Sequence, residues 1–126
     1  MYGQWPVNSR AQADSRAPSA VPFNEGEIQR LALDTAGLAR VREAIAAGAR
    51  QAARLGLDGI EIHAAHGHLL HEFLSPTANR RTDDYGGALA NRLRFPLDVF
   101  DAVRAAFPAD KPVGVRLSAT DWVDGG

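Results

Sequence analysis

The pattern of apolar and polar positions is clearest between residues 34 and 56. Apolar residues recur there every three or four positions, which predicts an amphipathic helix with one buried face. Asp34 or Thr35 can cap its beginning, and Gly56 stands where a left-handed residue would end it. The apolar positions of this helix are Leu38, Val41, Ile45, Ala49, Ala52 and Leu55.

Two short segments that are predicted to be β-strands follow, and they are separated by about 50 residues. In "DGIEIH", Ile60 and Ile62 fall on one face of a strand, and Glu61 and His63 on the other. A second strand is expected at 113–117.

Helical patterns fill the sequence between these strands. "GHLLHEFL" predicts one or two helical turns that end at Ser75-Pro76, and a polar loop with a Gly-Gly turn comes next. A longer helix is expected at about 89–107. Pro96 lies inside it, so the helix is expected to kink there or to begin near it. Its expected buried stripe is Leu93, Leu97, Phe100, Val103 and Phe107.

The order of elements predicts an α/β fold with parallel strands. Strands joined by a long helical crossover run parallel, and parallel sheets are covered by helices or closed into a barrel. Two strands cannot make such a sheet alone, and a complete (β/α)₈ barrel takes about 250 residues. The 126-residue chain therefore has the length of part of such a fold.

Residues 1–26 differ from the rest. They carry scattered Pro, Ser, Asn and Gly without periodicity, which is typical of a loop-like segment preceding one domain at 27–126. Two alternatives stay open for this segment: a disordered tail, or an ordered loop anchored by Trp5, Val21 and Phe23.

Composition narrows the class of protein. With 14 basic and 15 acidic side chains, the chain lacks the positive field that nucleic-acid or membrane-surface binding needs. It holds no cysteine, so disulfides and thiolate metal sites are excluded. No apolar run approaches the roughly 20 residues of a membrane helix, and Tyr-Gly-Gln-Trp-Pro after Met1 is unlike a secretory signal. We expect a cytoplasmic protein.

All four histidines lie within nine positions, at His63, His66, His68 and His71. A metal site, a ligand site and a solvated helix face are the three explanations. No His-Glu-x-x-His motif is present, so a metal is not expected. His71 is expected to be a surface or packing residue of a helix. His63 and Arg116 stand at the carboxyl ends of the two strands, where functional groups gather in parallel folds. Arg116 could instead form an ion pair with Asp121 or Glu61.

Several motifs at these spacings resemble the Old Yellow Enzyme family of NADH:flavin oxidoreductases, in its xenobiotic reductase or ene-reductase branch. They are "HAAHG" at 63–67, "FLSP" at 73–76, "NRRTDDYGG" at 79–87, "NR" at 91–92 and "VRLSATDW" at 115–122. The resemblance implies part of a TIM (β/α)₈ barrel, comprising about two parallel strands with their helices. It also implies FMN reduced by NADH or NADPH, and hydride transfer from the reduced flavin to activated alkenes such as enones.

The resemblance also implies roles for individual residues. His63 and His66 match the pair that binds the oxygen of an enone or a phenolic ligand, as an oxyanion hole does. Arg116 matches the arginine at the pyrimidine edge of the flavin. A third set matches a polar network that we interpret as structural: Asn79, Arg81, Asp83, Asn91 and Arg92.

The chain departs from the family pattern in two ways. His68 stands where the family has the tyrosine credited with donating a proton to the substrate, so His68 is the candidate catalytic residue. The segments with the other flavin contacts, including the phosphate-binding strands, are not in this sequence. We therefore expect a fragment of an ene-reductase that self-associates or forms a homo-oligomer. The alternative is a non-catalytic remnant or an assembly piece that needs a complementary chain. The natural alkene and the preferred nicotinamide cannot be inferred from the sequence.

Overall fold

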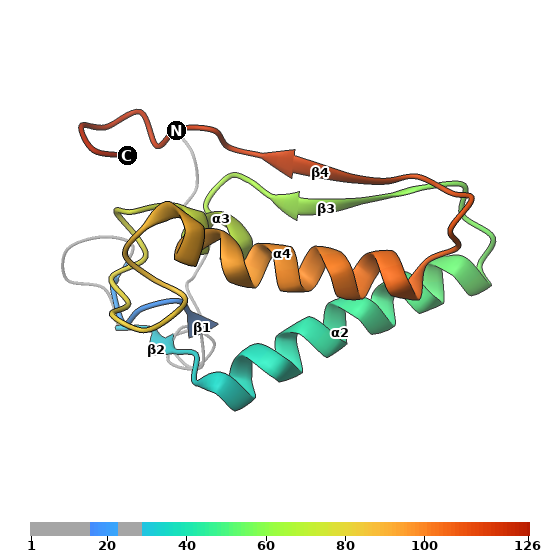
Figure 1. Ribbon diagram of the computed structural model, residues 1–126, viewed down its shortest axis with the longest axis horizontal. Helices are drawn as coiled ribbons and strands as arrows, with labels where there is room; N and C mark the ends of the chain where they lie inside the picture. The colour runs from blue at the N-terminus through green and yellow to red at the C-terminus, as the bar shows by residue number, and fades with distance from the viewer. Residues whose placement is uncertain (1–15, 23–28) are drawn as a thin grey trace, which may run out of the picture.

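The computed structural model describes residues 16–22 and 29–126. Figure 1 shows three layers, with a small parallel sheet over one long helix and a second long helix beneath that one. Among the described residues, no helix has both the length and the apolar composition needed to cross a membrane. The elements are β1 (Arg16–Ala17), β2 (Leu31–Ala32), α2 (Thr35–Arg54), β3 (Ile60–Ala64), α3 (Leu69–Leu74), α4 (Leu89–Ala106) and β4 (Val113–Leu117).

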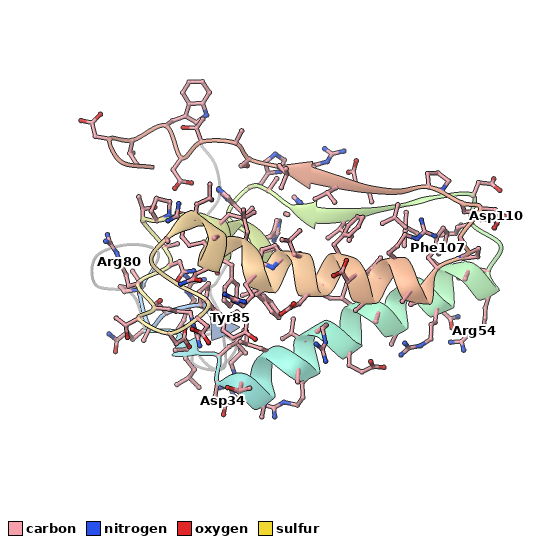
Figure 2. The ribbon with its side chains drawn as sticks, viewed as in Figure 1. Asp34, Arg54, Arg80, Tyr85, Phe107 and Asp110 are labelled. Carbon is pink, nitrogen blue, oxygen red and sulfur yellow. The ribbon has the colours of Figure 1, made fainter. Side chains whose placement is uncertain are left out.

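The first long helix, α2, begins and ends where the sequence predicts. The Asp34 carboxylate accepts a hydrogen bond from the Gly37 N–H at 2.6 Å, which satisfies one of the free amides at the helix start. Leu55 caps the last turn, and Gly56 follows in the left-handed conformation at φ 77°. Asp34 and Arg54 mark the two ends of α2 in Figure 2.

The two five-residue strands pair in parallel, as predicted, and residues 60–64 lie opposite residues 113–117. Ile62 lies opposite Val115, and His63 opposite Arg116. Because side chains alternate along a strand, the isoleucines of β3 point toward the helices while Glu61 and His63 point to the open face. Among the described residues, no further strand pairs with this sheet.

The second long helix, α4, corrects two details of the prediction. It begins at Leu89 and runs on through Pro96, so a start near the proline is wrong. The expected buried stripe is confirmed at Val103 and Phe107, but Leu97 is 54% exposed and Leu93 and Phe100 are only half-buried. Phe95 and Val99 are buried instead. The reason is that α4 packs most extensively against α2 and α3. Leu93, Leu97 and Phe100 instead face an apolar groove along the sheet.

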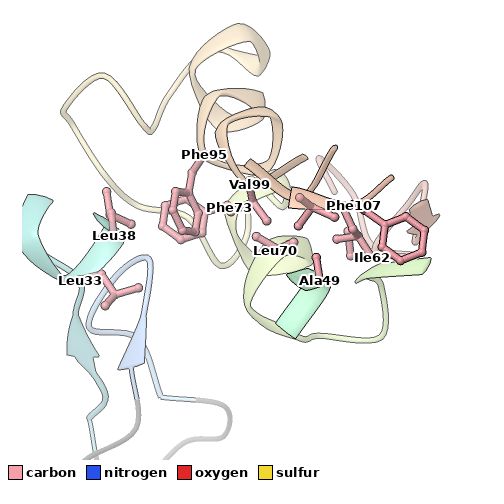
Figure 3. Close-up of a cluster of buried hydrophobic side chains, with 11 residues drawn as sticks. Leu33, Leu38, Ala49, Ile62, Leu70, Phe73, Phe95, Val99 and Phe107 are labelled. Carbon is pink, nitrogen blue, oxygen red and sulfur yellow. The ribbon is translucent and has the colours of Figure 1, made fainter. Parts of the chain in front are cut away.

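The apolar core lies among the helices. Phe73 on α3 and Phe95 on α4 are fully buried, with ring centroids 4.6 Å apart in a tilted arrangement (Figure 3). Leu38 and Ala49 contribute the buried face of α2. This core fixes α3, and α3 in turn fixes the loop that follows β3.

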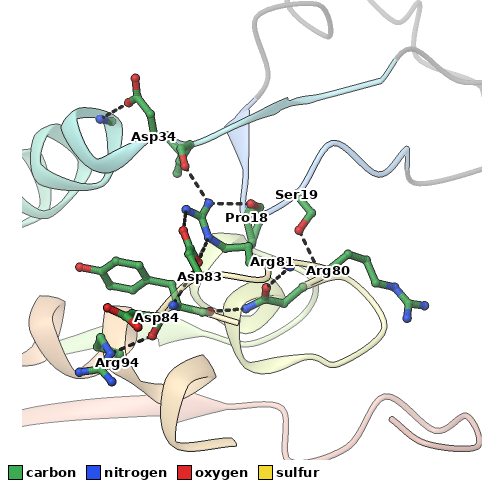
Figure 4. A network of polar contacts seen from close by, with 12 residues as sticks. Pro18, Ser19, Asp34, Arg80, Arg81, Asp83, Asp84 and Arg94 are labelled. Atoms are coloured by element: carbon green, nitrogen blue, oxygen red, sulfur yellow. Dashed lines mark hydrogen bonds and ion pairs between the residues drawn. The ribbon is translucent and has the colours of Figure 1, made fainter. Parts of the chain in front are cut away.

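The polar motif at 79–92 has the structural role that we expected. Asn79 is buried and donates from its amide to the carbonyls of Phe73 and Tyr85, at 2.8 Å each. Arg81 donates to the carbonyls of Pro18 and Leu33 and pairs with the Asp83 carboxylate (Figure 4). Gly86 is required in the turn, because a Cβ there would lie 2.2 Å from the Arg81 carbonyl oxygen.

The same motif joins the N-terminal segment to the body of the molecule. β1 and β2 form a parallel pair of two residues each, which the sequence did not indicate. The backbone N–H of Arg80 donates to the Ser19 hydroxyl at 2.8 Å. Of the anchors proposed for an ordered loop, Val21 is half-buried. Trp5 and Phe23 lie outside the described residues.

Candidate active site

The carboxyl ends of β3 and β4 bring His63 and Arg116 together. They are register partners on the open face of the sheet. The Arg116 Nε donates to Glu61 Oε1 at 2.7 Å, so of the two partners that the sequence suggested for Arg116, Glu61 is the one observed. Both side chains of this ion pair are about half exposed, at 57% and 52%. Among the described residues, Glu61 is the one that bonds the guanidinium, and it does so through Nε, which leaves the terminal nitrogens available to a ligand.

Two further histidines join His63 in an exposed imidazole cluster. The His66 ring stands edge-on to the His63 ring, with centroids 5.3 Å apart. The His68 ring is tilted against His63 at 4.4 Å. Three imidazoles from one short segment thus lie together at the end of β3.

The hydrogen bonding of His63 defines which ring nitrogen can act as a donor. The backbone N–H of Ala65 donates to Nδ1 of His63 at 3.3 Å, so a neutral ring carries its proton on Nε2. The pKa of His63 lies below the usual 6.5, first because the ring is partly desolvated and then because His68, His66 and Arg116 repel a positive charge. Glu61 acts in the opposite direction on this pKa. His63 is therefore a neutral N–H donor near neutral pH.

The backbone at His66 is unusual. Its φ is 56°, in the left-handed region that non-glycine residues seldom adopt, and Gly67 follows at φ 76°. The His66 N–H donates to the Ser118 hydroxyl at 3.0 Å. This bond ties the loop after β3 to the residue that directly follows β4.

The fourth histidine, His71, belongs to a different environment. It lies on α3 with its side chain 13% exposed, and its Nε2 is 2.9 Å from Asp121 Oδ1. This fits the expected packing role. Sequence reasoning missed the contributions of Ser118 and Asp121 to the loop after β3. Both lie in the polar stretch directly after β4, which is the one sequence signal that could have indicated them.

Chemically, the cluster suits an electron-rich ligand. Arg116 supplies a cation, and His63 supplies an N–H on the same face of the sheet. Within the described part of the chain, no group of three or more His, Asp or Glu side chains is arranged to hold a metal ion. The site can therefore bind and polarise an oxygen through hydrogen bonds.

Comparison with known proteins gives the family. A family model described as NADH:flavin oxidoreductase / NADH oxidase matches residues 3–126. The chain belongs to this family. It is 49% identical to an NADPH dehydrogenase of Geobacillus thermodenitrificans, over 84% of this chain and 31% of that protein. It is 43% identical to an NADH:flavin oxidoreductase of Gibberella zeae, over 97% of this chain and 28% of that protein.

The family has a known fold. The structure of morphinone reductase in complex with tetrahydroNAD is similar to this chain with a TM-score of 0.76 and 38% identity. The match covers 82% of this chain and 32% of that one. The predicted fold class, an α/β portion of a TIM barrel, and the resemblance to Old Yellow Enzyme relatives are confirmed. FMN and NAD(P)H are the cofactors of this oxidoreductase family. The chain spans about a third of the length of these relatives.

Proposed function

We propose that this chain carries the substrate-oxygen site and one flavin contact of an FMN-dependent ene-reductase. The observation that carries the proposal is the register of β3 and β4, which sets His63 beside Arg116 at the carboxyl ends of parallel strands. Bound FMN would supply hydride transfer from NAD(P)H to the β-carbon of an activated alkene such as an enone.

His63 and His66 would bind the carbonyl oxygen of the enone. The free Nε2–H of His63 is a neutral donor, and its depressed pKa keeps it neutral at working pH. Two aimed N–H groups stabilise the negative charge that develops on this oxygen when the alkene accepts hydride. A phenolate would be bound in the same way, because its oxygen already carries that charge.

Arg116 would contact the flavin ring. Its planar fork of donors suits carbonyl oxygens at a ring edge, and its terminal nitrogens are available for them. The residues present therefore fit one edge of the ring system. A single guanidinium does not balance a phosphate group of nearly two negative charges, so further groups, supplied by an associated copy, would have to hold the FMN phosphate.

His68 would donate the proton that completes alkene reduction. It sits at the N-cap of α3, and its ring contacts His63. This places an imidazole beside the oxygen-binding group, where a proton donor to the α-carbon is needed. The proposal accounts for a histidine at the position of the family's tyrosine.

A second candidate is an assembly piece that needs a complementary chain. It is favoured by two spaces along the strands. A cavity of about 480 Å³ follows β3 and is lined mostly by apolar residues of α2 and β3. An apolar groove of about 280 Å³ lies between β4 and α4. Strands of a closed barrel pair on both edges, so a second copy or another chain would fill these spaces.

One experiment separates the two candidates. The purified chain is titrated with FMN, and absorbance, particle mass and NADPH oxidation with 2-cyclohexenone are measured. We expect a yellow, self-associated protein that reduces the enone, and Arg116→Met should weaken FMN binding by about 1.5–3 kcal/mol. Arg42→Met, an exposed change on α2, is the matched control. A protein that retains no FMN after gel filtration would contradict the enzyme and favour the assembly piece.

A further inference from the structure

The loop after β3 contains a strained corner. His66 and Gly67 are both left-handed, with φ of 56° and 76°. Glycine adopts this conformation freely, whereas a residue with a side chain does so only where its surroundings hold it. This left-handed corner sets the direction of the His66 ring, so a residue that stabilises the corner also orients His66.

His71 makes the contact that holds this corner from α3. The Gly67 N–H donates to Nδ1 of His71 at 2.9 Å. The turn is closed by the His68 N–H, which donates to the Ala65 carbonyl at 3.1 Å. Because Nδ1 accepts this hydrogen bond from the backbone, a neutral His71 ring carries its proton on Nε2.

Asp121 makes this tautomer the favoured one. Its Oδ1 lies 2.9 Å from Nε2 of His71 and can only accept. Its Oδ2 accepts from the hydroxyls of Ser75 at 2.6 Å and Thr77 at 3.2 Å, which fixes the carboxylate. Both side chains of the His71–Asp121 pair are 13% exposed, so water competes weakly for these bonds.

We propose that His71 and Asp121 are positioning residues that set the orientation of His66 for ligand binding. Neither reaches the ligand-binding face. They act through the chain Asp121, His71 and the Gly67 N–H, which links the segment after β4 to the loop after β3. The inference deepens the proposed function and rests on it, since His66 is the group positioned.

Two nearly isosteric variants each keep one of the two hydrogen bonds of His71 and remove the other. The side-chain oxygen of asparagine can replace Nδ1 and accept from Gly67, whereas the amide of glutamine can replace Nε2 and donate to Asp121. His71→Asn should therefore keep the corner, and His71→Gln should lose it. His71→Phe removes both bonds, and Asp124→Asn, an exposed change in the same C-terminal segment, is the control.

The measurement uses NMR of the full chain with ¹⁵N-labelled histidine, titrated with 4-nitrophenolate. In the parent, His71 should show the tautomer protonated on Nε2, and the His63 and His66 signals should shift with phenolate. His71→Gln and His71→Phe should bind phenolate about tenfold more weakly, as expected for the loss of an aligned donor. His71→Asn and Asp124→Asn should stay within about twofold of the parent.

The outcomes distinguish this inference from the proposed function. A His71 ring protonated on Nδ1, or parent-like binding by His71→Phe, would overturn the positioning role. If the parent does not respond to phenolate, the proposed function fails. The positioning role is then decided by the backbone coupling at His66, which should leave its left-handed value in His71→Gln and stay there in His71→Asn. An unchanged coupling in His71→Gln would overturn the role.

Discussion

The two sides of α4 differ in how completely they are packed. Toward α2 and α3, Phe73, Phe95 and Val99 are 0–2% exposed. Toward the sheet, Val115 is 42% and Leu117 60% exposed, although both are apolar strand residues. The side of α4 that faces the helices forms a fully buried core. On the side that faces the sheet, apolar side chains of β4 remain exposed. The stability of this chain thus comes mainly from its helices, while its proposed site lies on the exposed face of the sheet.

The largest effect should come from the side of α4 that faces the helices. Phe95→Ala removes a fully buried ring and should lower the free energy of unfolding by about 3–5 kcal/mol. Leu117→Ala should cost less than about 1 kcal/mol, because little of its surface is buried. Denaturant unfolding of both variants checks the contrast. An equal cost at Leu117 would show that another copy covers the sheet in solution.

The next effect should come from the polar network that joins the N-terminal segment to the body. Arg81→Ala leaves the Pro18 and Leu33 carbonyls without their donor and should cost about 2–3 kcal/mol. Arg80→Ala is the matched control. The Arg80 bond to Ser19 comes from the backbone, so this variant should stay within about 0.5 kcal/mol of the parent. Equal costs for both arginines would refute the structural role of Arg81.

The His68 position should show a kinetic effect of intermediate size. We consider the barrel of the Geobacillus thermodenitrificans NADPH dehydrogenase carrying residues 56–126 of this chain. A tyrosine hydroxyl keeps its proton to about pH 10 and so stays a proton donor across this range. His68→Tyr should therefore reoxidise the flavin with an enone about tenfold faster at pH 8, with less dependence on pH from 5 to 9. Identical pH profiles for the two proteins would rule out the proton-donor role.

A smaller effect concerns the charge balance around His63. Glu61→Gln should lower the pKa of His63 further, because this carboxylate is the group that raises it, and His68→Phe should raise it. The folded pKa lies below the unfolded value of about 6.5. The unfolded chain then binds more protons between the two values, so stability should rise with pH across that window and level off above it. NMR titration of the ring measures each shift, and a His63 pKa above 6.5 in the parent would contradict the electrostatics.

Much of the fold could be predicted because local rules decide it. The Asp34 cap, the Gly56 stop and the alternation in "GIEIH" each act within a few residues. The buried face of α4 could not be predicted in the same way. Phe95 and Leu97 are both apolar, and the choice between them depends on which layers cover the helix. The two-residue strands β1 and β2 are too short to leave a periodic signal.

In the candidate site, too, the features set by local sequence could be predicted, whereas those set by tertiary packing could not. The strand ends and the spacing of the histidines indicate that His63 and Arg116 meet, and the register confirms that they do. Three-dimensional packing decides which residues pair with Arg116 and with Asp121. Arg116 takes Glu61 across the sheet, and Asp121 takes His71 from α3. The sequence suggested Glu61 and Asp121 as partners of Arg116 but could not choose between them, and it did not indicate the His71–Asp121 pair, because each pair joins residues about 50 positions apart.

The proposed function depends most directly on His63 and His66 as the oxygen site of a flavin enzyme. The most direct measurement is a titration of the same chimeric barrel, loaded with FMN, with a phenol such as 4-nitrophenol, followed by its charge-transfer absorbance. We predict a charge-transfer band in the parent chimera, and a phenol affinity at least about tenfold weaker in both His63→Ala and His66→Ala, since each loses a hydrogen bond to a charged oxygen. If both variants bound the phenol as tightly as the parent chimera, this role of His63 and His66 would be contradicted.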